Sequence, residues 1–487
     1  MLIRRILCAF VVLLAGSAFA QPASSPASAE LARLTHEQIT QVEAPSALLK
    51  LAAIYKKSAD YERLSWTLER LAALQPNAGD VRYALATTYA MLGDTTKTYD
   101  TLLALQRTGY GYDVARNPNF AKATGTKVWD FIVDGFKKNL TPAGDGKVAF
   151  TLPGGDTLVD SIAWDARRKQ FLVGSVRDGS IRRVDEHGKV SDFIKADADN
   201  GLWSVYALAV DVDNDVLYVA STSSVYFKKF AQADFGKAGV FKFSLADGKL
   251  LDKYLLEAGK AQNTLSSIAV GPGNEVFAAD GLRNIIYRVD GGALKPFIEN
   301  PKLTSVRGMA VSGDGRFLYF SDYKLGVFGA DLAAGRAFDV RYNPANVTLG
   351  GIDGLAWYDN HLVAVQSGMS PRRMVRFSLG SDGRSVIGAT VLDSANPHFT
   401  LPTNGTINGD GFYFIANSQK NEYDGYGSPK DASRLKPVEI FRSDLRFGWD
   451  NVKHESLSRA ATVISESHPG SGHFSNVEGG STSVSGN

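Results

Sequence analysis

The chain has 487 residues, of which 44% are hydrophobic and 21% are charged, so wholesale disorder is excluded and a sizeable core can form. Its 53 Lys and Arg nearly balance its 51 Asp and Glu, and this balance gives no indication of binding to nucleic acid or to an anionic membrane. The 48 glycines, together with 26 Phe and 19 Tyr, favour many tight turns between β-strands.

Residues 1–20 have the pattern of a secretory signal peptide. A basic start precedes an apolar run, Ile6–Gly16, and an Ala-Phe-Ala cleavage pattern stands directly before Gln21. An uncleaved anchor is the alternative. The single cysteine, Cys8, lies inside this segment, and no later apolar stretch approaches the ~20 residues that a membrane-spanning helix needs. We therefore expect a periplasmic or secreted mature protein without thiols and without a transmembrane span.

A helical pattern begins at Pro45, after residues 21–44, which have the Pro-, Ala- and Ser-rich composition of a linker. Leu51 recurs as Leu85 at a spacing of 34 residues, as do three other positions. This period resembles the tetratricopeptide repeat, which is two helices around a short turn. We expect a helical-repeat domain over residues 45–140 that either binds a partner protein in a concave groove or forms a cap on the next domain.

From residue 146 to residue 458 the pattern changes to short β-type runs. Six segments share one frame, in which an apolar run is followed by a polar turn and a second apolar run. The segments begin at Asp160, Tyr206, Ser266, Arg307, Asp353 and Asn404. Six such units of about 50 residues predict a six-bladed β-propeller. The predicted fold class is therefore mainly β with an N-terminal all-α domain, and a β-sandwich is the alternative.

Two further segments complete the predicted organisation. The strand-like run Lys147–Leu152 has no hairpin partner of its own, so we predict that it closes the ring as the outermost strand of the last blade, beside strands between Phe412 and Phe441. Residues 459–487 are rich in Ser and Gly and predict a mobile tail.

The first positions of the six segments form the candidate site. The innermost strand of each propeller blade follows the central channel, so these positions should form a ring at its mouth. A polar ring on an apolar scaffold is typical of a small-molecule site, and a water-filled channel is the alternative. The candidate catalytic residues are Asp160, Arg307 and Asp353. The candidate ligand-binding residues are Tyr206, Ser266 and Asn404.

Two insertions interrupt the regular repeat near this ring. Residues 221–238 and 417–437 both carry several aromatic side chains. Loops of this length usually have a role. We expect them to form a lid over a carbohydrate-like or aromatic ligand, with packing against the helical repeats as the alternative.

Residues 147–445 resemble the regucalcin and gluconolactonase propellers and their strictosidine-synthase-like relatives. Asp353-Gly-Leu-Ala-Trp357 is similar to the family's Asp-Gly metal-ligand segment, and Asp160-Ser-Ile-Ala-Trp164 is similar to its first-blade motif, in which the family has Glu. The resemblance implies one calcium-like divalent cation on the axis, where it would polarise the carbonyl group of a lactone or an ester.

The sequence departs from the family at one ligand position, where Arg307 replaces Asn. An arginine cannot ligate a cation, so we expect its guanidinium to replace the metal and to bridge Asp160 and Asp353. Alternatively, Asp160, Asp353 and Asn404 hold calcium together with water. Two functions therefore remain open. One is an exported hydrolase of lactones or esters. The other is a non-catalytic periplasmic module that binds a ligand on the propeller and a partner protein on the repeats.

Overall fold

The computed structural model describes residues 33–256, 259 and 262–446. The chain forms two compact units, Met1–Lys138 and Asn139–Asn487. The predicted signal peptide and the predicted tail lie outside the described residues. Within the described ranges, no helix is long and apolar enough to cross a membrane.

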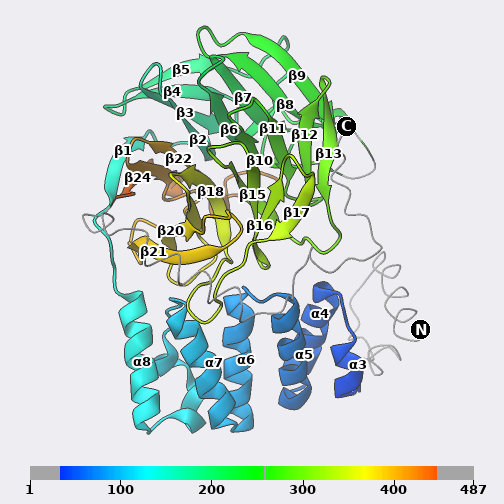
Figure 1. Ribbon diagram of the computed structural model, residues 1–487, viewed down its shortest axis with the longest axis vertical. Coiled ribbons are helices and arrows are strands. Elements are labelled where there is room, and N and C mark those ends of the chain that lie inside the picture. The colour runs from blue at the N-terminus through cyan, green and yellow to red at the C-terminus, as the bar shows by residue number, and fades with distance from the viewer. Residues whose placement is uncertain (1–32, 257–258, 260–261, 447–487) are drawn as a thin grey trace. The chain divides into compact units, whose positions relative to one another are not determined.

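The first unit is helical (Figure 1). Its elements are α3 (His36–Thr40), α4 (Pro45–Lys57), α5 (Tyr61–Leu74), α6 (Gly79–Leu92), α7 (Thr95–Arg107), η1 (Val114–Arg116), η2 (Pro118–Ala123) and α8 (Lys127–Leu140). Asp60 and Asp94 each accept a backbone hydrogen bond in the first turn of the helix that they precede, α5 and α7. The helices lie where the sequence predicts helix pairs, but their assignment to the tetratricopeptide family remains a prediction.

The predicted linker differs from the structure near its end, because α3 lies inside it. The Thr35 hydroxyl accepts from the backbone of Gln38, whose side chain accepts from the backbone of Thr35, and this capping box starts the helix. Ile39 and Val42 are buried in the helical core. The sequence pattern assigns this short helix to the linker because the residues before it are rich in Pro and Ser.

The second unit contains six four-stranded antiparallel sheets among the described residues. Their inner strands contact one another in cyclic order, so the sheets are the six blades of a β-propeller (Figure 1). Blades 1 to 3 are β2 (Val159–Asp165) to β5 (Val190–Ile194), β6 (Ser204–Asp211) to β9 (Leu250–Leu256), and β10 (Leu265–Val270) to β13 (Ala293–Glu299). Blades 4 and 5 are β14 (Val306–Val311) to β17 (Arg336–Asp339) and β18 (Ile352–Tyr358) to β21 (Val386–Ser394).

The middle strands of blades 1 to 5 are β3 (Gln170–Ser175), β4 (Ile181–Asp185), β7 (Val216–Thr222), β8 (Ala238–Ser244), β11 (Val276–Asp280), β12 (Ile285–Asp290), β15 (Phe317–Asp322), β16 (Gly326–Asp331), β19 (His361–Gln366) and β20 (Arg373–Leu379). Many of these strands are apolar on both faces because adjacent blades cover both sides of each sheet. The hydrophobic core therefore lies between the blades. One cluster, for example, joins Leu172 of blade 1 to Leu217 and Phe241 of blade 2.

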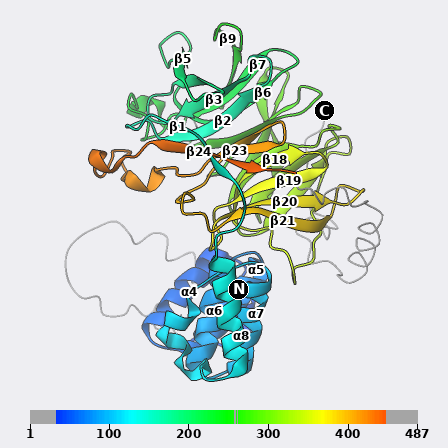
Figure 2. The same cartoon turned by 90° about the vertical axis from the view of Figure 1, so that its left-hand side faces the viewer.

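The last blade closes the ring as the sequence predicts. It consists of β22 (Gly405–Asn408), β23 (Gly411–Ile415), β24 (Val438–Asp444) and, from the start of the unit, β1 (Lys147–Leu152). β1 pairs antiparallel with β24, from Lys147 opposite Arg442 to Leu152 opposite Val438, and Figure 2 shows the two strands side by side. The two ends of the propeller thus share one sheet.

Candidate functional site

The structure places the six ring residues at the starts of the six inner strands. Asp160, Ser266, Arg307 and Asp353 are the second residues of β2, β10, β14 and β18, Tyr206 is the third of β6, and Asn404 directly precedes β22. Several of them interact with one another. The Asn404 amide donates to the backbone carbonyl of Asp160 at 3.0 Å, and Asp160 interacts electrostatically with both Asp353 and Arg307.

Asp160 and Asp353 are the two carboxylates of the mouth. Burial raises the pKa of Asp160 to about 6, and the neighbouring Asp353 adds to this rise. Burial also raises the pKa of Asp353, although a hydrogen bond from the Ser367 hydroxyl and two nearby cations oppose it. Asp160 therefore exchanges its proton close to neutral pH.

Arg307 lies beside only one of these carboxylates. Its Nε is 3.9 Å from Oδ1 of Asp353 and donates to the Ser305 hydroxyl at 3.0 Å. Its guanidinium carbon is 5.6 Å from the centre of the Tyr323 ring. Among the described residues it makes no hydrogen bond to Asp160, so the expected bridge between the carboxylates is not formed. Ser305 and Tyr323 hold the guanidinium on the side of blade 4.

Lys420 is the functional candidate that the sequence did not reveal. It begins η4 (Lys420–Glu422) in the second insertion, and its positive charge opposes the rise in pKa of both Asp160 and Asp353. An exposed lysine in a long loop carries no local pattern. The one sequence feature that pointed to Lys420 is its position in the second insertion, between two strands of the last blade.

Both insertions contact the ring through Tyr206. This side chain is buried with Tyr423 of the second insertion and lies against Tyr226 of the first. Its hydroxyl donates to the Ser224 hydroxyl at 3.0 Å, and burial raises its pKa. The rings of Tyr226 and Tyr423 meet edge to face, with centroids 6.3 Å apart. The two insertions therefore lie beside the channel mouth, and their role as a lid stays a prediction.

The channel below the ring is narrow. A cavity of about 50 Å³ is lined in part by the ring residue Asn404. Its lining also includes five apolar residues that lie two positions after ring residues, namely Ile162, Leu208, Ile268, Met309 and Leu355. A space of this size holds a few water molecules, whereas small-molecule sites usually measure about 300 Å³ or more. A metabolite would therefore bind outside this cavity, at the ring itself. Ser266 adds a buried hydroxyl oxygen without a hydrogen-bond partner in the described part of the chain.

The residues of the mouth do not fit a divalent cation. Asp160, Asp353 and Asn404 were the predicted ligands, but Arg307 and Lys420 already place two positive charges beside the two carboxylates. A divalent ion would meet their repulsion. No group of three or more His, Cys, Asp or Glu suited to a metal occurs among the described residues.

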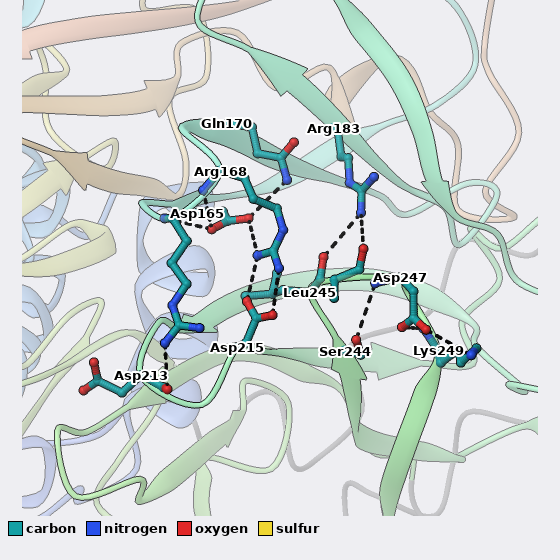
Figure 3. Close-up of polar contacts among 12 residues, drawn as sticks. Asp165, Arg168, Gln170, Arg183, Asp213, Asp215, Ser244, Leu245, Asp247 and Lys249 are labelled. Carbon is teal, nitrogen blue, oxygen red and sulfur yellow. Dashed lines mark hydrogen bonds and ion pairs between the residues drawn. The ribbon is translucent and has the colours of Figure 1, made fainter.

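A separate charged cluster joins blades 1 and 2, as Figure 3 shows. Arg168 donates to both carboxylate oxygens of Asp215 at 2.7 Å and to Asp165 at 3.2 Å. Arg183 donates to the backbone carbonyl of Leu245 in blade 2. Asp165 ends β2, whereas Asp160 lies near its start, so the cluster sits at the other end of the strand from the mouth. Its acids have arginine partners, and we interpret it as a structural link between blades.

Comparisons with known proteins give only a general fold likeness. No protein-family model matches the sequence, and no curated protein matches it. Among solved structures, the chain is similar to a gluconolactonase from Xanthomonas campestris, with a TM-score of 0.41, 16% identity, and 63% of this chain and 99% of that chain covered. It is also similar to regucalcin from Agrobacterium tumefaciens, described as calcium-binding, with a TM-score of 0.41, 15% identity and coverage of 62% and 97%. For virginiamycin B lyase from Staphylococcus aureus the TM-score is 0.38, the identity is 14% and the coverage is 63% and 100%. Likeness at these values says nothing about ligand or activity.

Proposed function

We propose that the propeller binds a small molecule at its channel mouth without the help of a metal. The observation that carries this proposal is the set of opposite charges gathered at one channel mouth. Asp160 and Asp353 supply carboxylates, and Arg307 and Lys420 supply the cations that a metal would otherwise provide. Tyr206 and the two insertions add an aromatic wall. Such a ring offers both donors and acceptors to a polar ligand.

Hydrolysis of a lactone or an ester is the second candidate function, and the proton affinity of Asp160 favours it. A carboxylate whose pKa is about 6 can act as a general base near neutral pH. Asp160 would take a proton from the water that attacks the carbonyl carbon, and the carbonyl oxygen would become an oxyanion. Arg307 and Lys420 would stabilise that charge. Asp160 would return the proton to the leaving alkoxide when the C–O bond breaks.

Two further parts of the proposal concern the cell. The signal-peptide pattern of residues 1–20 supports export, so the mature chain should begin at Gln21 in the periplasm or outside the cell. Mass spectrometry of the protein from its native cell checks this, and an intact N-terminus in the cytoplasm would contradict it.

The helical unit is proposed to bind a partner protein. Deleting residues 45–140 should abolish a pull-down and leave the propeller folded, whereas unfolding would favour a cap.

The ligand-binding proposal is tested by thermal-shift screening of metabolites against chelator-treated protein. A true ligand raises the melting temperature of the wild type and has less effect on Asp353→Asn. Asp252→Asn, which changes a carboxylate on the outer strand β9, is the matched control. A rise in melting temperature that is equal in the wild type and both variants would contradict the proposal. Turnover of lactones or p-nitrophenyl acetate that is lost in Asp160→Asn would support hydrolysis, and turnover unchanged in that variant would contradict it.

A further inference from the structure

We propose that the mouth recognises the carboxylate group of its ligand, with Lys420 and Arg307 as the two cationic contacts and Arg177 as the residue that positions Lys420. This inference rests on the binding function proposed above and names the chemical class of the ligand. Two features support it: the spare hydrogen-bond donors of the two cations and the anchoring of the loop that carries Lys420.

Both cations have donors to spare. A guanidinium has five N–H donors, and Arg307 uses Nε on Ser305, while its 3.9 Å approach to Asp353 is too long for a hydrogen bond. The Arg307 side chain is 41% exposed. Within the described ranges, the Lys420 ammonium makes no hydrogen bond or ion pair, and the residue is exposed. A ligand can therefore reach both groups.

Arg177 holds the loop that carries Lys420. It follows β3, is only 8% exposed, and binds the carboxylate of Asp156 with two hydrogen bonds of 2.6 and 2.9 Å. Its Nη1 also donates to the backbone carbonyls of Tyr226 at 2.6 Å and Gly427 at 2.5 Å. One buried guanidinium therefore fastens both insertions to blade 1.

Tyr423 connects Arg177 to the ring residue Tyr206. It is buried, lies three residues after Lys420, and its ring centre is 5.5 Å from the guanidinium carbon of Arg177. It packs in one cluster with Tyr206 and with Leu158, which precedes β2. The end of η4 is thus anchored beside the start of β2. Lys420, at the other end of this short helix, interacts electrostatically with Asp160 and Asp353 without an ion pair of its own.

The free donors of the mouth favour an anion. The Asp353 carboxylate already accepts from the Ser367 hydroxyl and has Arg307 nearby. Among the described residues, by contrast, the Lys420 ammonium and the remaining N–H groups of Arg307 have no acceptor. A ligand carboxylate can accept from both the ammonium and the guanidinium. Charge-assisted bonds are about twice as strong as neutral ones, so an uncharged amide should bind at least about tenfold more weakly.

Calorimetry with defined probes tests this inference on the full mature chain. The probes are gluconate and lactate, each compared with its primary amide at pH 7.5. We expect the carboxylates to bind at least tenfold more tightly than the amides. Amides that bind as well as the acids, or carboxylates that do not bind, would overturn the inference.

Substitutions assign the effect to the named residues. Lys420→Gln and Arg307→Gln should each weaken carboxylate binding at least tenfold, while Lys436→Gln, which removes the same charge near the end of the same loop, should not change it. Arg177→Met should weaken binding in the wild type but add little in a Lys420→Gln background, because it acts through Lys420. Additive losses would refute the positioning role of Arg177.

The outcomes also separate this inference from the proposed binding function. A neutral or cationic ligand that binds the wild type and is lost in Asp353→Asn would overturn carboxylate recognition and leave the mouth as a binding site. A metabolite screen in which no ligand binds less tightly to Asp353→Asn than to the wild type would overturn both carboxylate recognition and the proposed binding function.

Discussion

Replacing Arg177 by Met should destabilise the propeller and release its second insertion. The substitution keeps an apolar stem of similar length and removes the guanidinium. It therefore deletes the two hydrogen bonds to Asp156 and those to the carbonyls of Tyr226 and Gly427, together with the cation–π contact to Tyr423.

The expected magnitude follows from burial. Removing one partner of a buried ion pair usually costs about 3–5 kcal/mol, because the other charge remains unpaired. The Asp156 side chain is 28% exposed and keeps the ammonium of Lys228 at 3.3 Å, so water and this second cation stabilise it in part when Arg177 is absent. We therefore expect a loss of about 3 kcal/mol, which corresponds to roughly 6 °C of melting temperature in a large domain.

Urea denaturation followed by tyrosine and tryptophan fluorescence measures the loss, and limited trypsin digestion reports cleavage at lysines and arginines of residues 417–437. Arg434→Met is the matched control in the same loop. Its pair with Glu422 spans 3.5 Å and its side chain is 65% exposed, so it should cost less than about 1 kcal/mol. Destabilisation of Arg177→Met no larger than that of the control, with unchanged digestion, would refute the reasoning.

The pairing with Asp156 also has a definite pH dependence. Burial alone would raise the pKa of Asp156, but the hydrogen bonds from Arg177 and Tyr423 outweigh it, and the pKa lies below its usual value. A depressed pKa contributes stability above the unfolded value of about 3.9, and this stability is lost as the pH falls through the folded value. A double-mutant cycle of Arg177→Met with Asp156→Asn should therefore show strong coupling at pH 7 and weaker coupling below pH 4.

Three other predictions concern the mouth and the closure of the ring. Arg307→Asn alone should not bind calcium in calorimetry after chelation, because Lys420 still repels a cation, whereas Arg307→Asn with Lys420→Gln should bind it; tight binding by the wild type would contradict this. Asp160 has a folded pKa of about 6, above its unfolded value of about 3.9, so it contributes stability below about pH 4 that is lost as the pH rises through 6. Asp160→Asn should flatten the stability profile over that range, and an unchanged profile would be evidence against a raised pKa. Phe150→Ala in β1 should cost about 3–5 kcal/mol because this buried ring joins the closing blade to blade 1, while Thr151→Ala on its exposed face should cost less than about 0.5 kcal/mol; equal costs would argue against closure by β1.

The sequence determined the architecture and the ring positions of this protein. The apolar runs and turns of each blade are local signals, and their sixfold repetition predicts six inner strands. Corresponding positions of a repeat lie at corresponding places in a ring, so the repeat alone assigns Asp160, Arg307 and Asp353 to one mouth. The same pattern predicted that β1 closes the ring, because the run Lys147–Leu152 had no hairpin partner of its own. The helix α3 was missed because its capping box is short and follows a linker-like composition.

The tertiary structure alone decided which charges meet. Arg177 and Gly427 are 250 positions apart, and no sequence pattern links them. The same is true of Lys420, which interacts electrostatically with the two carboxylates from a loop whose Tyr423 is buried with Tyr206. The strength of a charge interaction depends on distance and on access of water, and both are set by packing between distant segments. That is why the sequence identified Arg307 as a departure from a metal site, but could not show that its guanidinium lies beside Asp353 alone and that a second cation completes the ring.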